Sequence, residues 1–191
     1  SYEDLLSMLD QKFRPLEQFW DPFYSNRERP VPFFKNAPDE NLVSYYERNL
    51  IQPGKAMDLG CGPGRNSIYL AKQGFDVIGY DISNVAIQWA QERSNENNLD
   101  IEFECKSAFE VDFCDHFDLI YDSGCLHHLL PHRRIKYLNI IHRSLKSGGL
   151  FGITCFRPGF GDQGGPVREM SDWDVYEEGT MNGGLAFTEE K

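Results

Sequence analysis

The chain has 191 residues, of which 40% are hydrophobic and 26% charged, a composition typical of a single folded domain. Thirty acidic against 19 basic residues give a net charge of -11, which repels a phosphate backbone, so we expect no nucleic acid as a partner. No apolar run approaches the ~20 residues that cross a bilayer. The start of the chain also lacks the basic residues of a signal peptide, so we expect a cytoplasmic protein without membrane contact.

Residues 1–52 predict a helical and aromatic cover. Apolar residues recur at helical spacing over residues 3–13, and Pro15 limits how far this helix runs. Residues 16–34 mix aromatic side chains with charges and three prolines without a clean period, which predicts an ordered but irregular segment. A second helix is expected from Asp39 to about Leu50, before the punctuation of Pro53-Gly54.

Residues 53–156 predict the core, in which strands alternate with helices. We expect strands at residues 56–59, 75–80, 101–105, 117–121 and 150–156, with helices after the first, second and fourth. Ser83 opens the second of these helices, and the third starts near Pro131 and carries Ile135 and Ile141 inward. This alternation predicts an α/β fold with a mostly parallel sheet and helices on both faces. Residues 157–191 form an acidic, partly irregular segment of the same domain.

A glycine-rich turn follows the first expected strand, in the run Asp58-Leu59-Gly60-Cys61-Gly62-Pro63-Gly64-Arg65-Asn66. Alternate glycines let the backbone fold tightly and approach a ligand closely. Asp81 ends the second strand, where its two oxygens can accept hydrogen bonds from both hydroxyls of a ribose. The carboxyl ends of parallel strands meet at one edge of a sheet, so the turn and this carboxylate predict a nucleoside pocket.

The spacing of the glycines separates two kinds of cofactor. The nicotinamide fingerprint is G-x-G-x-x-G, whereas here the third glycine comes one residue early, at Gly64. Asp58, two residues before the first glycine, disfavours a pyrophosphate and suits an ammonium group. A nicotinamide oxidoreductase therefore stays a weaker alternative, and so does a turn without a ligand in which Asp81 only caps a helix.

The run from about Lys55 to Phe156 resembles the class I S-adenosylmethionine-dependent methyltransferases, whose first motif has the form acidic-x-G-x-G-x-G. The resemblance implies a Rossmann-like fold and S-adenosylmethionine as the cofactor. The resemblance further implies that Gly60, Gly62 and Gly64 border the methionine part of the cofactor. It implies that Asp58 supports the turn and that Asp81 binds the ribose. The other cofactor residues that it implies follow the first four strands: Cys61, Asn66, Ile82, Ser107, Ala108, Phe109 and Asp122.

The segment after the fourth strand predicts the methyl-acceptor side. A hydroxyl or amine acceptor must lose a proton, and His127-His128 offers a base, so both histidines are candidate catalytic residues. The alternative is that one is a buried spacer and the other a surface residue. Trp20 and Tyr24 are candidate substrate contacts on a lid that excludes water; the alternative is plain hydrophobic packing.

The acceptor is expected to be a small molecule. The run Asp122-Ser123-Gly124-Cys125 is not the N-P-P-Y or D-P-P-Y of methyltransferases that act on nucleobases. It is similar to bacterial enzymes of the tellurite-resistance and thiopurine types, among which the acceptor varies. A non-catalytic module that only binds the cofactor is the second hypothesis. No metal is expected, because the five cysteines are scattered singly and His128 and His132 lack a third ligand.

The same resemblance implies seven strands, with a final antiparallel pair that residues 157–191 do not evidently supply. We therefore expect a shortened form of a longer enzyme, in which Thr188 begins a helix that is not completed. The fifth strand would then be an open edge that pairs with a second molecule, or it would be covered by the segment after Phe156.

Overall fold

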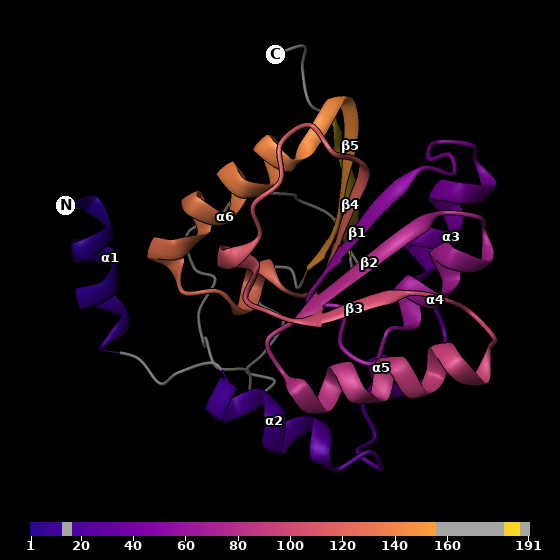
Figure 1. Ribbon diagram of the computed structural model, residues 1–191, viewed down its shortest axis with the longest axis horizontal. Helices are drawn as coiled ribbons and strands as arrows, with labels where there is room; N and C mark the ends of the chain where they lie inside the picture. Colours follow the sequence, from indigo (N-terminus) through magenta and orange to yellow (C-terminus); the bar gives the residue numbers. More distant parts are fainter. Residues whose placement is uncertain (13–16, 156–181, 188–191) are drawn as a thin grey trace.

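One six-stranded sheet forms the centre of the computed structural model, which describes residues 1–12, 17–155 and 182–187. The strand order is β3-β2-β1-β4-β5-β6 (Figure 1), and the first five strands in this order run parallel. The strands are β1 (Lys55–Leu59), β2 (Asp76–Asp81), β3 (Glu102–Cys105), β4 (Phe117–Ser123), β5 (Leu145–Cys155) and β6 (Asn182–Phe187). The predicted α/β fold with a mostly parallel sheet is confirmed.

The strands sort their side chains between two hydrophobic clusters, because successive residues point to opposite faces. On one face Ala56 and Leu119 pack with residues of the helices before and after β1. On the other, Met57 and Ile120 pack with Tyr137 and Ile141. Both faces are therefore buried around the central strands, as a parallel sheet requires.

Helices cover both faces, as predicted. Figure 1 shows α3 (Glu40–Glu47), α4 (Arg65–Lys72) and α5 (Asn84–Glu96) on one side of the sheet and α6 (Pro131–Ser144) on the other. Ser83 caps α5, since its side chain accepts a hydrogen bond from the backbone N–H of Ala86 at 3.2 Å. Among the helices of the described residues, none combines the length and apolar character needed to span a membrane.

The buried stripe of α6 differs from the expected one. Ile135 is 54% exposed, so the prediction that it points inward is wrong, whereas Ile141 is buried as expected. The buried residues of α6 are Arg134, Tyr137, Ile140, Ile141 and Ser144, which recur every three or four positions and so lie on one helix face. Arg134, a charged residue, occupies a buried position directly before Ile135. A search for apolar residues at helical spacing therefore selects the wrong face of the helix.

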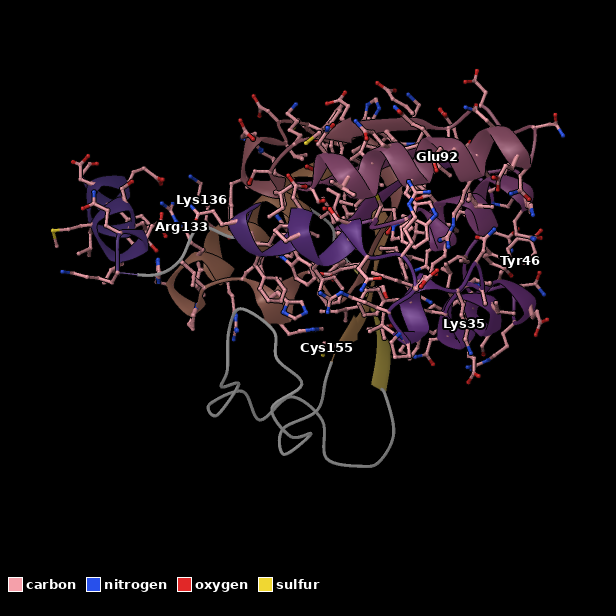
Figure 2. The ribbon with its side chains drawn as sticks, turned by 90° about the horizontal axis from the view of Figure 1, so that it is seen from below. Lys35, Tyr46, Glu92, Arg133, Lys136 and Cys155 are labelled. Carbon is pink, nitrogen blue, oxygen red and sulfur yellow. The ribbon has the colours of Figure 1, made fainter. Side chains whose placement is uncertain are left out.

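The N-terminal cover is more regular than predicted. The first helix is α1 (Tyr2–Asp10), and a helix, α2 (Glu17–Ser25), stands where the prediction was an irregular segment. That prediction is wrong for α2, which contains Pro22 in its interior. Charged pairs hold α1 to α6, because Arg133 binds both Asp10 and Glu3, and Lys136 binds Glu3 at 3.0 Å (Figure 2).

The far edge of β5 is covered rather than open. β6 pairs with it in antiparallel register, from Leu150 opposite Phe187 to Cys155 opposite Asn182. The count of five strands is thus one short, and the predicted pairing of a second molecule along β5 has no free edge there. Of the two expectations, cover by the segment after Phe156 is the one that the sheet shows. The helix expected at Thr188 lies outside the described residues.

Candidate functional site

The glycine turn connects β1 to α4 and is fixed to β2. The backbone N–H groups of Gly60 and Cys61 both donate to the carbonyl oxygen of Tyr80, at 2.8 and 3.0 Å. Gly60 has φ +68°, and a Cβ on it would lie 2.9 Å from Cys125 Cβ in the segment after β4. Only glycine fits a left-handed position with so close a neighbour, so the turn passes directly beside the loop of the predicted acceptor side.

Asp81 reaches from the end of β2 to the turn. Its Oδ2 accepts from the N–H of Gly62 at 2.9 Å, and its Oδ1 accepts from the N–H of Ser83 at 2.8 Å. Burial raises the pKa of this carboxyl to about 6, and the two backbone donors work against that rise. The structure therefore brings together Gly62 and Asp81, the two parts of the predicted nucleoside pocket.

Asp58 lies beneath the turn and is only 1% exposed. Its Oδ2 accepts from the Ser67 hydroxyl at 2.6 Å, and burial raises its pKa to about 7. Asn66 is also buried, and both ends of its side-chain amide bind Asp39: Nδ2 donates to Asp39 Oδ2 at 3.1 Å and Oδ1 accepts from the Asp39 N–H at 2.9 Å. Asp58 and Asn66 thus support the turn from inside.

A buried polar network was missed by sequence reasoning. Asp39 precedes α3 as its N-cap residue, yet its carboxylate makes no cap hydrogen bond and turns inward to Arg65 at 2.5 Å. Tyr121 donates to Asp39 Oδ2 at 3.0 Å and lies 3.0 Å from the hydroxyl of Thr154. Arg65 also donates to Ser123 at 3.1 Å. The network joins α3 and the glycine turn to the carboxyl ends of β4 and β5.

The segment after β3 lies next to Asp81. The N–H of Lys106 donates to the carbonyl of Asp81 at 2.9 Å. Ser107 then caps a short 3-10 turn, Ala108–Glu110, whose first residue is buried. Ile82 contacts the same region, since its carbonyl accepts from Cys105 Sγ at 3.5 Å. The predicted adenine segment and the predicted ribose residue are therefore neighbours.

Asp122, at the end of β4, holds the following loop in shape. Its oxygens accept from the N–H groups of Cys125 at 2.6 Å and Leu126 at 3.0 Å, and from the Tyr137 hydroxyl at 2.7 Å. It is 0% exposed, and burial raises its pKa to about 6. Three donors already engage this carboxylate, so its clearest role is to position the loop that carries the histidines.

The two histidines form a short 3-10 turn, Leu126–His128, with ring centroids 4.1 Å apart. Burial lowers the pKa of His127 to about 3 and of His128 to about 4, and the charge of Arg134 lowers both further. Arg134 donates to the carbonyls of Leu129 and His127 and is 3% exposed. Both imidazoles are therefore neutral at pH 7 and can accept a proton.

Helix α2 lies over this edge of the sheet and against α5. Asp21 accepts from the Ser83 hydroxyl at 2.6 Å, and the Trp20 ring meets the His128 ring edge-on at 4.9 Å. Tyr24 is 6% exposed, and its hydroxyl would lie 3.0 Å from a Cβ on Gly62. Burial, helped by the charge of Asp81, raises the Tyr24 pKa well above its usual range. Of the two candidate substrate residues, Trp20 thus contacts His128 and Tyr24 lies beside the glycine turn.

A family model described as a methyltransferase domain matches residues 56–149 of the chain. The match begins in β1 and ends in β5, so it contains the glycine turn, Asp81 and the histidine loop. The chain carries a class I S-adenosylmethionine-dependent methyltransferase domain. The predicted Rossmann-like fold and cofactor family are confirmed.

Curated relatives of this methyltransferase domain agree. An uncharacterized methyltransferase of Schizosaccharomyces pombe is 38% identical over 87 residues, 43% of this chain and 60% of that protein. An uncharacterized methyltransferase of Synechocystis is 34% identical over 63% of this chain and 53% of its own length. A probable methyltransferase, TehB of Haemophilus influenzae, is 35% identical over 39% of this chain and 26% of its own length. The chain spans little more than half the length of the first two.

Solved structures share the fold. One, from a study of the conversion of a disulfide bond into a thioacetal group during echinomycin biosynthesis, has a TM-score of 0.67 and 28% identity, and the match covers 73% of this chain and 59% of that one. A Burkholderia thailandensis 1,6-didemethyltoxoflavin N1-methyltransferase, solved with its acceptor and S-adenosylhomocysteine, has a TM-score of 0.62 at 24% identity over 84% and 67%. The second likeness is one of fold alone.

Proposed function

We propose that this chain binds S-adenosylmethionine across the carboxyl ends of β1 and β2 and transfers its methyl group to a small molecule. The observation that carries the proposal is the contact of Asp81 with Gly62, because it puts a carboxylate beside a glycine turn at the edge where parallel sheets bind nucleosides. Gly60 and Gly62 have φ of +68° and +52°, so the turn keeps a left-handed backbone that packs tightly beside Cys125 and Tyr24.

The residues around this contact have distinct roles in the proposal. Asp81 accepts hydrogen bonds from the ribose hydroxyls, while Gly60, Cys61, Gly62 and Gly64 border the methionine part. Ile82, Ser107, Ala108 and Phe109 lie beside the adenine. Asp58 and Asn66 hold the turn from below, as their buried hydrogen bonds support. Asp122 faces the acceptor side and fixes the histidine loop through its three donors.

When bound, S-adenosylmethionine supplies a methyl group that its sulfonium has already activated. The chain's residues then have to align the acceptor in line with that group and keep water out, and alignment of this kind removes on the order of 7 to 11 kcal/mol of barrier in favourable cases. Trp20 and Tyr24 close the site from α2. His128 is neutral and lies at this edge, and its pKa of about 4 makes it a weak base. In the proposal its ring therefore takes the proton of a hydroxyl, amine or thiol as the new bond to the methyl group makes that proton acidic.

The acceptor itself is proposed by class only. Relatives are named as methyltransferases of different substrates, from a phosphoethanolamine N-methyltransferase of Zea mays to a tRNA (uracil(54)-C(5))-methyltransferase of Pyrococcus abyssi. The net charge of -11 favours the small molecule over the tRNA for this chain. The non-catalytic module stays the second candidate, because the contact of Asp81 with the glycine turn supports cofactor binding and does not itself require an acceptor.

Calorimetry with S-adenosylmethionine and S-adenosylhomocysteine tests the proposal, followed by a screen of thiols, phenols and amines for transfer of a labelled methyl group. Asp81→Ala should weaken cofactor binding by about 1 to 3 kcal/mol, the range for hydrogen bonds to a charged group. Asp76→Ala, at the exposed other end of the same strand, is the matched control and should leave affinity unchanged. Equal affinity of both variants would overturn the ribose role of Asp81. Binding without transfer to any acceptor would favour the non-catalytic module.

A further inference from the structure

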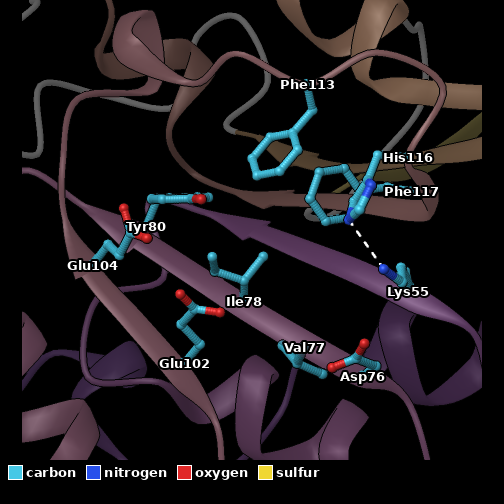
Figure 3. Close-up of a pocket in the computed structure, with 10 residues that line it drawn as sticks. All are labelled: Lys55, Asp76, Val77, Ile78, Tyr80, Glu102, Glu104, Phe113, His116 and Phe117. Carbon is cyan, nitrogen blue, oxygen red and sulfur yellow. Dashed lines mark hydrogen bonds between the residues drawn. The ribbon is translucent and has the colours of Figure 1, made fainter.

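A cavity of about 300 Å³ lies on the sheet away from the glycine turn (Figure 3). It sits over the amino-terminal half of β1 and β4 and along β2 and β3, on the face that carries α6. Ten residues line it: Lys55, Asp76, Val77, Ile78, Tyr80, Glu102, Glu104, Phe113, His116 and Phe117. None of them belongs to the proposed cofactor and acceptor site.

The cavity exists because this part of the sheet lacks a helical cover. The connection from β3 to β4 has only one short 3-10 turn, Ala108–Glu110, and α6 packs on β5 and on this turn. Within the described residues, no helix therefore covers the α6 side of β2 and β3. Residues at alternate positions of these strands, Ile78 and Tyr80 on β2 and Glu102 and Glu104 on β3, face the open space together.

The floor and one wall are apolar and flat. Ile78 and Phe113 are half-buried and supply accessible apolar surface, while Tyr80, which is 1% exposed, closes the floor. Phe113 and Phe117 stand beside them with ring centroids 5.0 Å apart, edge to face (Figure 3). A slot between aromatic rings and an aliphatic side chain suits a single flat ring, and its volume matches a small ligand.

The charged groups at the rim favour a cation. Asp76, Glu102 and Glu104 contribute three negative charges against two positive charges from Lys55 and from Lys106, which lies beside Glu104, a net charge of about -1. Lys55 lies 3.3 Å from Nε2 of His116, and since an ammonium only donates, that ring nitrogen accepts. The carboxylates of Glu104 and Glu102 help burial to raise the pKa of Tyr80 to about 12, so their field reaches the floor of the cavity.

The chain itself already places an ammonium at this rim. Lys106 Nζ lies 5.7 Å from the centre of the Tyr80 ring and 3.7 Å from Glu104 Oε2. The combination of an aromatic face and a carboxylate is one that binds organic cations in proteins. A ligand cation in the cavity would therefore compete with Lys106 for these two groups.

We infer that this cavity binds a small organic cation, a single ring that carries an ammonium group. The ring packs on Ile78 between Tyr80 and Phe113, and the ammonium lies between the carboxylates of Glu102 and Glu104. The site is distinct from the proposed methyl-transfer site, because the cavity lies on the α6 face of the sheet and none of its lining residues has a role in the proposed transfer. The inference concerns the charge of the ligand as well as its shape: a neutral or anionic ring of the same size should bind less well.

Benzylammonium is the probe, with benzyl alcohol and benzoate as neutral and anionic partners of the same ring. Each is titrated into the whole chain while NMR follows the methyl signal of Ile78 and the ring signals of Tyr80. We expect benzylammonium to shift both signals saturably, with a dissociation constant on the order of 1 mM for so small a ligand. Benzyl alcohol should bind several-fold more weakly and benzoate should not bind.

The variants separate the site from the general negative charge of the chain. Glu102→Gln with Glu104→Gln should weaken benzylammonium binding about fivefold, the effect of two partly exposed carboxylates. Glu47→Gln with Glu96→Gln removes the same charge from exposed positions outside the cavity and should leave the constant unchanged. Equal loss in both double variants, equal binding of benzyl alcohol, or shifts that miss Ile78 and Tyr80 would each overturn the inference. None of these outcomes depends on cofactor binding or on turnover.

Discussion

Replacement of Asp39 should lower the free energy of unfolding strongly, because its small side chain holds a buried polar network together. Its carboxylate binds Arg65 at 2.5 Å, Asn66 at 3.1 Å and Tyr121 at 3.0 Å, and Arg65 is only 14% exposed. Asp39→Ala leaves a nearly buried guanidinium without its counter-ion and the buried Asn66 amide without its acceptor, while Tyr121 keeps Thr154 as a partner. Breaking a buried ion pair in this way costs about 3 to 5 kcal/mol of unfolding free energy.

Urea denaturation measures this cost. With a slope of about 2 kcal/mol per molar urea, the midpoint should fall by roughly 2 M. Glu3→Ala is the control, because it removes two ion pairs at a side chain that is 52% exposed, so the urea midpoint should shift far less than for Asp39→Ala.

A double variant identifies the cause. If the uncompensated charge is what destabilises, Asp39→Ala combined with Arg65→Met should be more stable than Asp39→Ala alone, since no charge is then left buried. A loss below about 1 kcal/mol for Asp39→Ala, or no recovery in the double variant, would refute the reasoning.

Three further predictions concern the site. His128→Gln should lower turnover by roughly 10²- to 10⁴-fold and keep cofactor affinity, and turnover that survives would place the base elsewhere. Tyr24→Ala should speed the association of S-adenosylmethionine in stopped-flow fluorescence, because the ring that fills the space over Gly62 is gone, whereas Tyr24→Phe should stay as slow as the parent chain. Asp58 has a pKa raised from 3.8 to about 7 in the fold, so the stability that its neutral form contributes is present below pH 4 and lost as the pH rises to 7. The stability of the parent chain minus that of Asp58→Asn should therefore fall over this range in urea titrations without cofactor, and a constant difference would contradict the raised pKa.

The sequence predicts an element best where its local residue pattern alone determines the structure. The parallel strands carry apolar residues on both faces and are each followed by a turn, so their order along the chain and their approximate bounds are confirmed. Helix α2 was missed because Pro22 lowers helical propensity, while its aromatic side chains gain contacts with α5 that no local pattern contains. β6 was missed because Gly183 and Gly184 weaken the strand pattern and its pairing with β5 is non-local.

In the candidate site, too, one contact could be predicted from the sequence and another could not. Gly62 and Asp81 were paired correctly in advance, because parallel strands bring their carboxyl ends to one edge. The partnership of Asp39 with Arg65 crosses 26 positions of the chain, and a lone aspartate after a proline resembles an ordinary helix start. Only the packing of α3 against the turn shows that its carboxylate points inward. The cofactor and acceptor roles of the individual residues stay predictions.

Tyr80 connects two places that otherwise share no residue. Its carbonyl oxygen holds the N–H groups of Gly60 and Cys61, while its ring forms the floor of the cavity on the other side of β2. A ligand that shifts β2 through this ring would also shift the carbonyl that anchors the turn. Linkage would then require reciprocity: whatever factor a bound cation imposes on cofactor affinity, the cofactor imposes on cation affinity in equal measure. Tyr80 is the residue through which such coupling would pass.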